Sequence, residues 1–287
     1  MDDGTIVVTG AATGIGRRAA VELARRGHRV VVVTRSDDRT AAVLAEAAAT
    51  RRDARAVGVA ADLADLRQVR DAVERIAELG PVQAVINNAA ILAVARRRST
   101  VTPDGIEEIC AVNHVAPFVL TIGLLDHLID DGRVINAGSK GLTVMPWLRL
   151  DPDNLDGLVA GRRWSSARAY YLSKLAQLAF TAELCRRGVT ATALRIPSVR
   201  LDDERLRTYP RLLQLAYRPK MALATDPESV ARRYVELAVG ASPPCGHVDE
   251  RGRAIGWPNG SGAANLGAQV WWHTSALAGG TYPLDRD

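Results

Sequence analysis

Residues 5–16 read Thr5-Ile6-Val7-Val8-Thr9-Gly10-Ala11-Ala12-Thr13-Gly14-Ile15-Gly16. A β-branched run ends in three glycines, and a segment of helical period follows at 15–26. Glycine lets the backbone turn sharply and approach a phosphate, and the N-terminus of the next helix offers free N–H groups and a positive dipole. The spacing is G-x-x-x-G-x-G rather than G-x-G-x-x-G, but the physical requirement is the same. The stretch therefore predicts a strand, a phosphate-binding turn and a helix, with a plain tight turn as the alternative.

The same alternation of strand and helix patterns continues to about residue 200. It is typical of βαβ units around a parallel sheet, and the apolar strand runs suit a sheet that is covered on both faces. The expected strands are residues 6–9, 30–34, 57–60, 82–87, 134–137 and 190–196, with a short one near 246–249. The expected helices are residues 15–26, 38–51, 65–79, 104–128, 163–187 and 263–278, with another that opens at 225. We predict an α/β fold of the Rossmann type, a doubly wound parallel sheet of about seven strands, in a single domain over residues 1–287.

Residues 198–225 break this rhythm and are irregular, with helical potential at 203–217. Ligands of open α/β folds bind beyond the carboxyl ends of the strands, where such an insert would lie. We expect this insert to contribute to a substrate site. Residues 140–168 and the insert are fairly apolar, which favours a hydrophobic small molecule as the substrate.

The basic charge of the chain is mostly arginine. Of 37 basic residues only Lys140, Lys174 and Lys220 are lysines, and the formal net charge is +5. Acidic residues alternate with arginine along the chain, the densest basic run is the three arginines at 96–98, and two phenylalanines offer little for base stacking. We therefore expect no nucleic-acid partner.

Other classes of protein are also disfavoured. The sequence has no uninterrupted apolar window of about 18 residues, so it predicts no transmembrane helix. The acidic start of the chain is unlike a signal peptide. Three cysteines, Cys110, Cys185 and Cys245, are odd in number and far apart, so they predict no disulfide framework. The five histidines have no metal-ligand spacing. We expect a cytoplasmic protein without a metal or a membrane partner.

The end of the second expected strand distinguishes two dinucleotides. NAD sites place an acidic residue there for the ribose hydroxyl, whereas an arginine favours the additional phosphate of NADP. Here Thr34 is followed at once by Arg35, and Arg17 beyond the glycines is a second candidate cation. Asp37 and Asp38 come later and leave the ribose alternative open. The pattern favours NADP(H).

The most specific chemistry lies in residues 169–174. Tyr170 and Lys174 are four residues apart on an expected helix and therefore share a face, whereas Tyr171 is expected to point about 100° away. A free tyrosine titrates near 10, and a neighbouring ammonium lowers that pKa towards neutral pH. Lysine is rare in this chain, and the fork of arginine would not replace a compact point charge. We interpret the two residues as an acid–base pair, with a surface pair as the alternative.

Together these residues resemble the short-chain dehydrogenase/reductase family, and in particular its retinol-dehydrogenase-like branch. The resemblance covers nearly the whole chain. The motifs that carry it are the turn at 9–16, Asp62-Leu63, Asn87-Asn88-Ala89-Ala90, Thr102-Pro103-Asp104-Gly105, Val112-Asn113-His114-Val115, the segment 169–176 and Val270-Trp271-Trp272-His273-Thr274-Ser275.

The resemblance implies a role for individual residues. Tyr170 would be the acid–base and Lys174 its electrostatic partner, Ser139 would hydrogen-bond the substrate oxygen, and Asn113 would hold a water of the proton relay. The cofactor would bind at Gly10, Thr13, Gly14, Ile15, Gly16, Arg35, Asp62, Leu63, Asn88, Tyr170, Lys174 and Pro197. Two positions depart from the family pattern: Ala90 and Ser198 each stand where glycine is usual.

The leading hypothesis is thus an NADP(H)-dependent oxidoreductase that reduces a carbonyl or oxidises a secondary alcohol. A non-redox reaction on the same fold, such as an elimination, epimerisation or cyclisation, is one alternative, and a non-catalytic NADP(H)-binding protein is another. Relatives often form homodimers through the helices that correspond to 104–128 and 163–187, so a homodimer is a further expectation.

Overall fold

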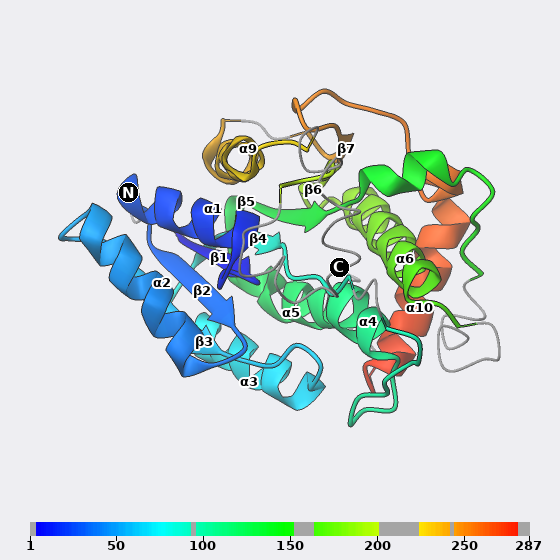
Figure 1. The fold of residues 1–287 in the computed structure, drawn as a ribbon, viewed down its shortest axis with the longest axis horizontal. Coiled ribbons are helices and arrows are strands. Elements are labelled where there is room, and N and C mark those ends of the chain that lie inside the picture. Colours follow the sequence, from blue (N-terminus) through cyan, green and yellow to red (C-terminus); the bar gives the residue numbers. More distant parts are fainter. Residues whose placement is uncertain (1–3, 93–95, 152–163, 201–223, 242–243, 281–287) are drawn as a thin grey trace.

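A computed structural model describes residues 4–92, 96–151, 164–200, 224–241 and 244–280. Seven parallel strands form one sheet in the order β3-β2-β1-β4-β5-β6-β7 (Figure 1). The strands are β1 (Thr5–Thr9), β2 (Val30–Thr34), β3 (Ala56–Ala60), β4 (Val82–Asn87), β5 (Leu128–Ala137), β6 (Ala191–Leu194) and β7 (Gly246–Val248). The predicted doubly wound sheet is confirmed. Its order reverses between β1 and β4, which opens the crevice where such folds bind ligands.

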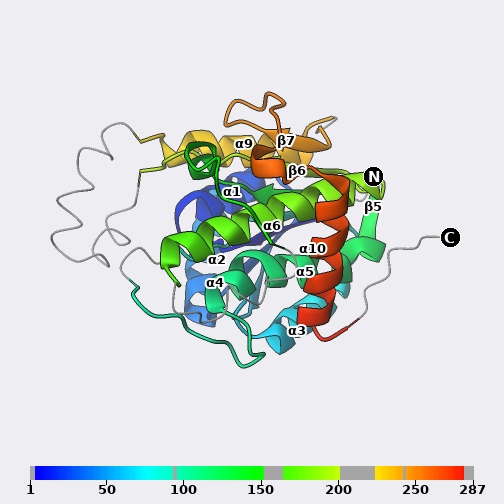
Figure 2. The ribbon, with the colours of Figure 1, turned by 90° about the vertical axis from the view of Figure 1, so that its right-hand side faces the viewer.

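Helices cover both faces of the sheet (Figures 1 and 2). They are α1 (Gly14–Arg25), α2 (Asp37–Thr50), α3 (Leu66–Ala77), α4 (Glu108–Cys110), α5 (Ala116–Leu124), α6 (Ser166–Arg186), α9 (Pro227–Val239) and α10 (Ala264–Leu277), with the shorter turns η1 (Ala111–Val115), η2 (Leu125–His127), η3 (Lys140–Val144) and η6 (Pro258–Gly260). One core lies between the sheet and α3, α5 and α6, and a second lies between the sheet and α1, α2 and α9. This burial explains why β2 is a run of valines.

Helix α10 lies across α6 on the outer side of the molecule (Figure 2). Trp271 packs edge-on against Phe118 of α5 and also contacts Phe180 of α6. Thr274 Oγ1 lies 2.8 Å from His114 Nε2, and burial lowers the pKa of His114 to about 4, so this imidazole is neutral at pH 7. The C-terminal helix therefore covers part of the face through which a dimer was expected.

The long helix expected at 104–128 begins later than expected and is interrupted. Gly105 has φ +78°, and Val101 pairs with Glu107, so a turn occupies the expected first residues and helix begins at Glu108. The stretch then passes through the π-helical turn η1 before α5. The helical stretch Glu108–His127 is long and apolar enough to cross a membrane, judged by length and composition alone. However, 83% of its apolar 18-residue window is buried inside the protein.

The number and spacing of the cysteines predicted no disulfide framework, yet the structure contains one disulfide bond. Cys185, near the end of α6, is bonded to Cys245, directly before β7, across 60 residues of sequence. Strands β6 and β7 pair at Thr192 and Gly246, and this pairing brings the two cysteines together. Cys110 is buried and takes no part in this bond. Sequence spacing alone could not reveal the contact, because it depends on the order of strands in the sheet.

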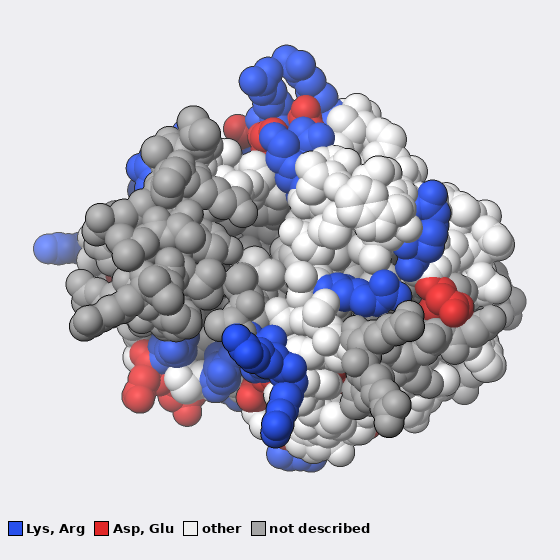
Figure 3. All heavy atoms as spheres, turned by 45° about the vertical axis from the view of Figure 1, so that its right-hand side comes forward, with Lys and Arg blue, Asp and Glu red and all other residues white. Residues whose placement is uncertain are grey.

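The basic residues show no continuous surface on the described part of the face in Figure 3. Lys and Arg lie there in separate groups, several with acidic side chains beside them. Ion pairs neutralise some of the arginines elsewhere in the described chain as well as on its surface, for example Arg96 with Glu108 and Arg18 with Glu228. Arginine in this chain is thus often neutralised locally.

Candidate active site

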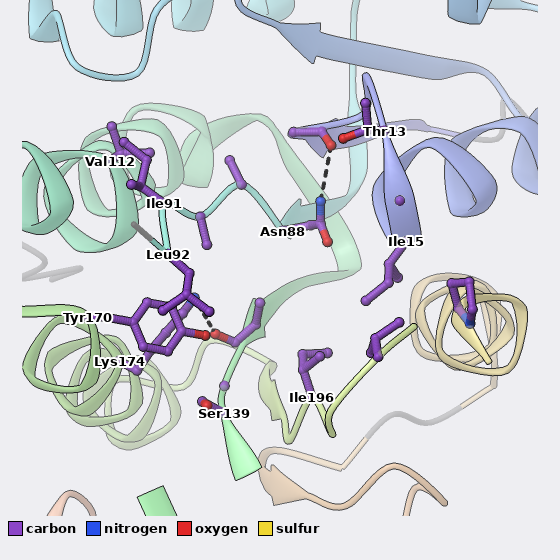
Figure 4. Close-up of a pocket in the computed structure, with 18 of the residues that line it drawn as sticks. Thr13, Ile15, Asn88, Ile91, Leu92, Val112, Ser139, Tyr170, Lys174 and Ile196 are labelled. Atoms are coloured by element: carbon purple, nitrogen blue, oxygen red, sulfur yellow. Dashed lines mark hydrogen bonds between the residues drawn. The ribbon is translucent and has the colours of Figure 1, made fainter. Parts of the chain in front are cut away.

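A cavity of about 780 Å³ lies at the carboxyl ends of the strands, on both sides of the point where the strand order reverses. Figure 4 shows Tyr170 and Lys174 of α6 on one side, with Thr13 and Ile15 opposite them. The structure brings most predicted site residues together here. Those that line the cavity are Gly10, Thr13, Gly14, Ile15, Arg35, Asp62, Leu63, Asn88, Ser139, Tyr170, Lys174 and Pro197.

The glycine turn forms one wall of the cavity. Gly10 has φ +64°, and a Cβ added there would lie 2.7 Å from the Ala89 backbone. Gly14 has φ +60°, and a Cβ added to it would meet no atom within 4 Å. Helix α1 begins at Gly14 without a side-chain hydrogen bond from Thr13, its capping residue. The Thr13 side chain thus does not occupy the first N–H groups of α1, and a helix N-terminus favours an anionic ligand.

Gly16 is not among the residues that line the cavity, although the resemblance assigned it to the cofactor. An added Cβ would lie 2.4 Å from Asn88 Nδ2 and 2.7 Å from the carbonyl oxygen of Gly10. The Asn88 amide donates to the carbonyl oxygens of Thr9 and Gly10 at 3.0 and 3.3 Å. Gly16 thus allows α1 to approach the end of β1, which is a packing role.

Gly16→Ala is expected to lower the free energy of unfolding by ~1–3 kcal/mol, because the groups that a Cβ would meet are backbone and a hydrogen-bonded amide. Urea unfolding of Gly16→Ala beside Gly256→Ala measures the effect. Gly256 is a matched control because an added Cβ there meets no atom within 4 Å. Equal free energies of unfolding for the two variants would refute the packing role.

Lys174 is the only lysine that the structure buries among its described residues, with 2% of its surface exposed. Its Nζ donates to the carbonyl oxygen of Ala137 at 2.8 Å and lies 6.0 Å from the centre of the Tyr170 ring. Burial lowers the pKa of Lys174 from 10.5 to about 8. The predicted pair is thus assembled on α6, whose first turn is capped by the Ser165 side chain.

Ser139 lies two residues beyond the end of β5 and lines the cavity on the same side as the pair (Figure 4). Its Oγ accepts a hydrogen bond from the backbone N–H of Gly141 at 3.3 Å and caps η3. The hydroxyl proton remains able to donate to a ligand. Ser139 therefore both caps η3 and lines the cavity.

Asn113 lies in η1 and is buried, and it is not among the lining residues. Its Oδ1 accepts from the backbone N–H of Ile91 at 2.7 Å, and its Nδ2 donates to the Ile91 carbonyl oxygen and to Ser173 Oγ, each at 3.1 Å. The side chain thereby fixes Ile91 in the cavity wall. That Asn113 holds a relay water stays a prediction.

Tyr171 was expected to point away from the pair, yet it also lines the cavity. Its ring meets that of Tyr170 edge-on at 5.1 Å, and a Cβ added to Gly141 would lie 2.4 Å from Tyr171 Cε1. The ammonium of Lys174 remains the partner of Tyr170. The sequence offered one usable signal, a glycine two residues after Ser139 that leaves room for a large ring.

The far end of the cavity is basic. Arg35 and Arg39 both line it, whereas Asp37 and Asp38 do not. Arg39, in the first turn of α2, was missed, because Arg35 lies before the helix and no helical period connects the two residues. Arg17 is instead paired with Glu46 at 2.5 Å and does not line the cavity.

The two departures from the family pattern, Ala90 and Ser198, also line the cavity. Beyond Ser198 the backbone is fixed by two hydrogen bonds, from Thr225 N–H to the Ser198 carbonyl oxygen at 2.8 Å and from Arg200 N–H to the Thr225 carbonyl oxygen at 3.0 Å. Residues 201–223, which hold most of the expected insert and its helical segment at 203–217, lie outside the described residues.

Comparison with known proteins gives the family. A family model described as short chain dehydrogenase matches residues 4–149, which is about half of the chain. The chain belongs to the short-chain dehydrogenase family. It is 30% identical to the dehydrogenase/reductase SDR family member FEY of Arabidopsis thaliana over 311 residues, 99% of this chain and 80% of that protein. It is 36% identical to retinol dehydrogenase 12 of Mus musculus over 220 residues, 74% of this chain and 66% of that protein.

Solved structures agree with this membership. A blue fluorescent protein from a metagenomic library, in complex with NADPH, matches with a TM-score of 0.66 and 27% identity over 86% of this chain and 96% of that chain. A short chain dehydrogenase from Burkholderia cenocepacia J2315, in complex with NADP, matches with a TM-score of 0.63 and 26% identity over 91% and 99% of the two chains. The predicted family and its retinol-dehydrogenase-like character are confirmed, so this short-chain dehydrogenase is an oxidoreductase by family.

Proposed function

We propose that this short-chain dehydrogenase is an NADP(H)-dependent enzyme that reduces a carbonyl, or oxidises a secondary alcohol, on a fairly hydrophobic small molecule. One observation carries the proposal: the Tyr170–Lys174 pair opens into the same cavity as Arg35 and Arg39. A group for proton transfer and charges suited to the phosphate of NADP thus meet in one site.

The residues present fit NADP(H). The uncapped start of α1 and the positive φ of Gly14 suit a pyrophosphate, and no atom of the described chain crowds that point. Arg35 and Arg39 suit the 2′-phosphate at the other end of the cavity. The relatives solved with NADPH and NADP support the same cofactor.

Each catalytic residue has a task in this chemistry. NADPH, when bound, supplies the hydride. The phenol of Tyr170 donates a proton to the carbonyl oxygen, and the ammonium of Lys174 stabilises the phenolate that remains. The hydroxyl of Ser139 donates a hydrogen bond to the same oxygen and orients it. Apolar side chains, among them Ile91 and Leu92, line the wall beside Tyr170 and suit a hydrophobic substrate (Figure 4).

The test is NADPH consumption with a panel of hydrophobic ketones and aldehydes, followed through the absorbance of the reduced nicotinamide. We expect turnover with at least one member of the panel and slower turnover with NADH. Tight NADPH binding without consumption across the panel would contradict the proposal and favour a non-redox reaction or a binding protein.

Arg35→Ala is expected to weaken NADPH binding about ten- to hundredfold, the range that a charge-assisted hydrogen bond of ~1.5–3 kcal/mol represents. NADH lacks the phosphate, so its dissociation constant should change less than about threefold. Fluorescence titration with both nucleotides measures the difference. Arg17→Ala is the matched control, because Arg17 is paired with Glu46 away from the cavity. Equal losses for NADPH and NADH in Arg35→Ala would refute the assignment.

A further inference from the structure

The described lining of the cavity is mostly basic where it is charged. Among the described residues that line it, five are basic and only Asp62 is acidic. Arg35 directly follows β2, Arg39 lies in the first turn of α2, and Lys174 belongs to the catalytic pair. Lys140 and Arg200 remain, and for Lys140 the structure shows the contacts of the ammonium within the described chain.

Lys140 follows Ser139 directly and is the first residue of η3. Its backbone N–H donates to the carbonyl oxygen of Ile196 at 2.9 Å, which ties it to the segment after β6. Its side chain is 51% exposed. The backbone of Lys140 is therefore held at the wall of the same cavity that Ser139 and Tyr170 line.

The charged groups that face Lys140 leave its ammonium partly available. Its Nζ lies 3.3 Å from Glu250 Oε1, while Arg195 donates to Glu250 Oε2 from Nε and Nη2 at 3.0 and 2.6 Å. Asp249 lies 4.0 Å from the same arginine. Arg195 is thus the stronger partner of Glu250, and Lys140 makes the longer contact. An ammonium has three N–H donors, and within the described chain Lys140 uses one of them on Glu250.

The wall beside Lys140 is apolar or aromatic, with Val144 and Tyr171 among the lining residues. A cation at the edge of such a wall suits a carboxylate carried on a hydrophobic body, because the ammonium donates charge-assisted hydrogen bonds to the carboxylate while the wall contacts the body. We propose that the substrate carries a carboxylate, which Lys140 binds while Ser139 and Tyr170 hold the carbonyl oxygen. This inference rests on the proposed function and adds a substrate class to it.

The experiment compares 3- and 4-acetylbenzoate with their methyl esters, so that only the negative charge differs within each pair. The quantity compared is kcat/KM for the acid divided by kcat/KM for its ester. For at least one isomer we expect Lys140→Met to lower this quotient at least tenfold. The variant should reduce the ester about as well as the unmodified enzyme does. Titration of the same compounds into the enzyme saturated with NADP⁺ should show the same loss of affinity for the acid alone. This second measurement needs no turnover.

Glu250→Gln separates a binding role from a structural one. If Lys140 only holds Glu250 in place, the two variants should lose activity equally on acid and ester, and the inference is wrong. If Lys140 binds the carboxylate, Glu250→Gln keeps the preference for the acid. An unchanged acid-to-ester ratio in Lys140→Met, with the esters still reduced, overturns the inference but leaves the proposed function intact. Absence of NADPH consumption together with selective binding of the acid by the unmodified enzyme overturns the proposed function instead.

Discussion

Tyr170→Phe is expected to reduce the rate of carbonyl reduction about 10²–10⁴-fold, because it removes the proton donor. The ring keeps its contact with Tyr171, and the ammonium of Lys174 keeps its hydrogen bond to Ala137. NADPH affinity should therefore change little. Single-turnover measurements with saturating NADPH, beside a titration of NADPH binding, separate the two quantities.

Tyr171→Phe is the matched control for this prediction. The two tyrosines are adjacent and both line the cavity, but only Tyr170 has the lysine partner. Removing the second hydroxyl should change the rate by less than about tenfold. Turnover that survives Tyr170→Phe, or a larger loss in Tyr171→Phe, would show that the acid–base has been assigned to the wrong residue.

Lys174→Met is expected to lower kcat for reduction about 100-fold at pH 7, since the phenolate of Tyr170 then forms without a neighbouring positive charge. The variant should also lose a feature of the pH profile. In the unmodified protein the pKa of Lys174 is about 8, so kcat should fall as the pH rises through that value and the ammonium loses its proton. A profile of Lys174→Met that still falls near pH 8 would assign this limb to another group.

The same shift predicts a change in stability with pH. The pKa of Lys174 is lowered from 10.5 to about 8 by burial, so between these values the unfolded chain binds the proton and the folded protein does not. Stability rises with pH wherever the unfolded state binds more protons. The contribution of Lys174 is therefore fully present above pH 10.5 and is lost as the pH falls through about 8. Urea unfolding of the cofactor-free protein across this range should show the rise, and Lys174→Met should lack it.

Much of the sheet could be predicted because buried parallel strands are apolar on both faces. β2 begins and ends at the residues expected from its valine run. β5 begins at Leu128, six residues earlier than expected, because Asp130, Asp131 and Gly132 conceal its first half. The pairing of β4 with β5 shifts register between Val82 and Ala84, opposite this first half, so the first half of β5 does not pair as a regular strand.

The site was predictable where its signals are local. Tyr170 and Lys174 are linked by the period of one helix, and the glycine turn is linked to α1 by direct succession. Contacts between distant segments were out of reach. The bond between Cys185 and Cys245 depends on strand order, and the packing of Gly16 depends on the approach of Asn88. The catalytic and cofactor roles of the site residues stay predictions until the variants are measured.

Beyond β6, Val199 and Thr225 form an isolated parallel bridge outside the sheet, shortly before α9 begins. The two ends are therefore held side by side by the backbone alone, whatever lies between them. Each doubling of the length of a flexible loop adds only about 0.6 kcal/mol to the cost of closing it. Segments of other lengths and compositions could therefore be joined at this point without altering the sheet or the position of α6.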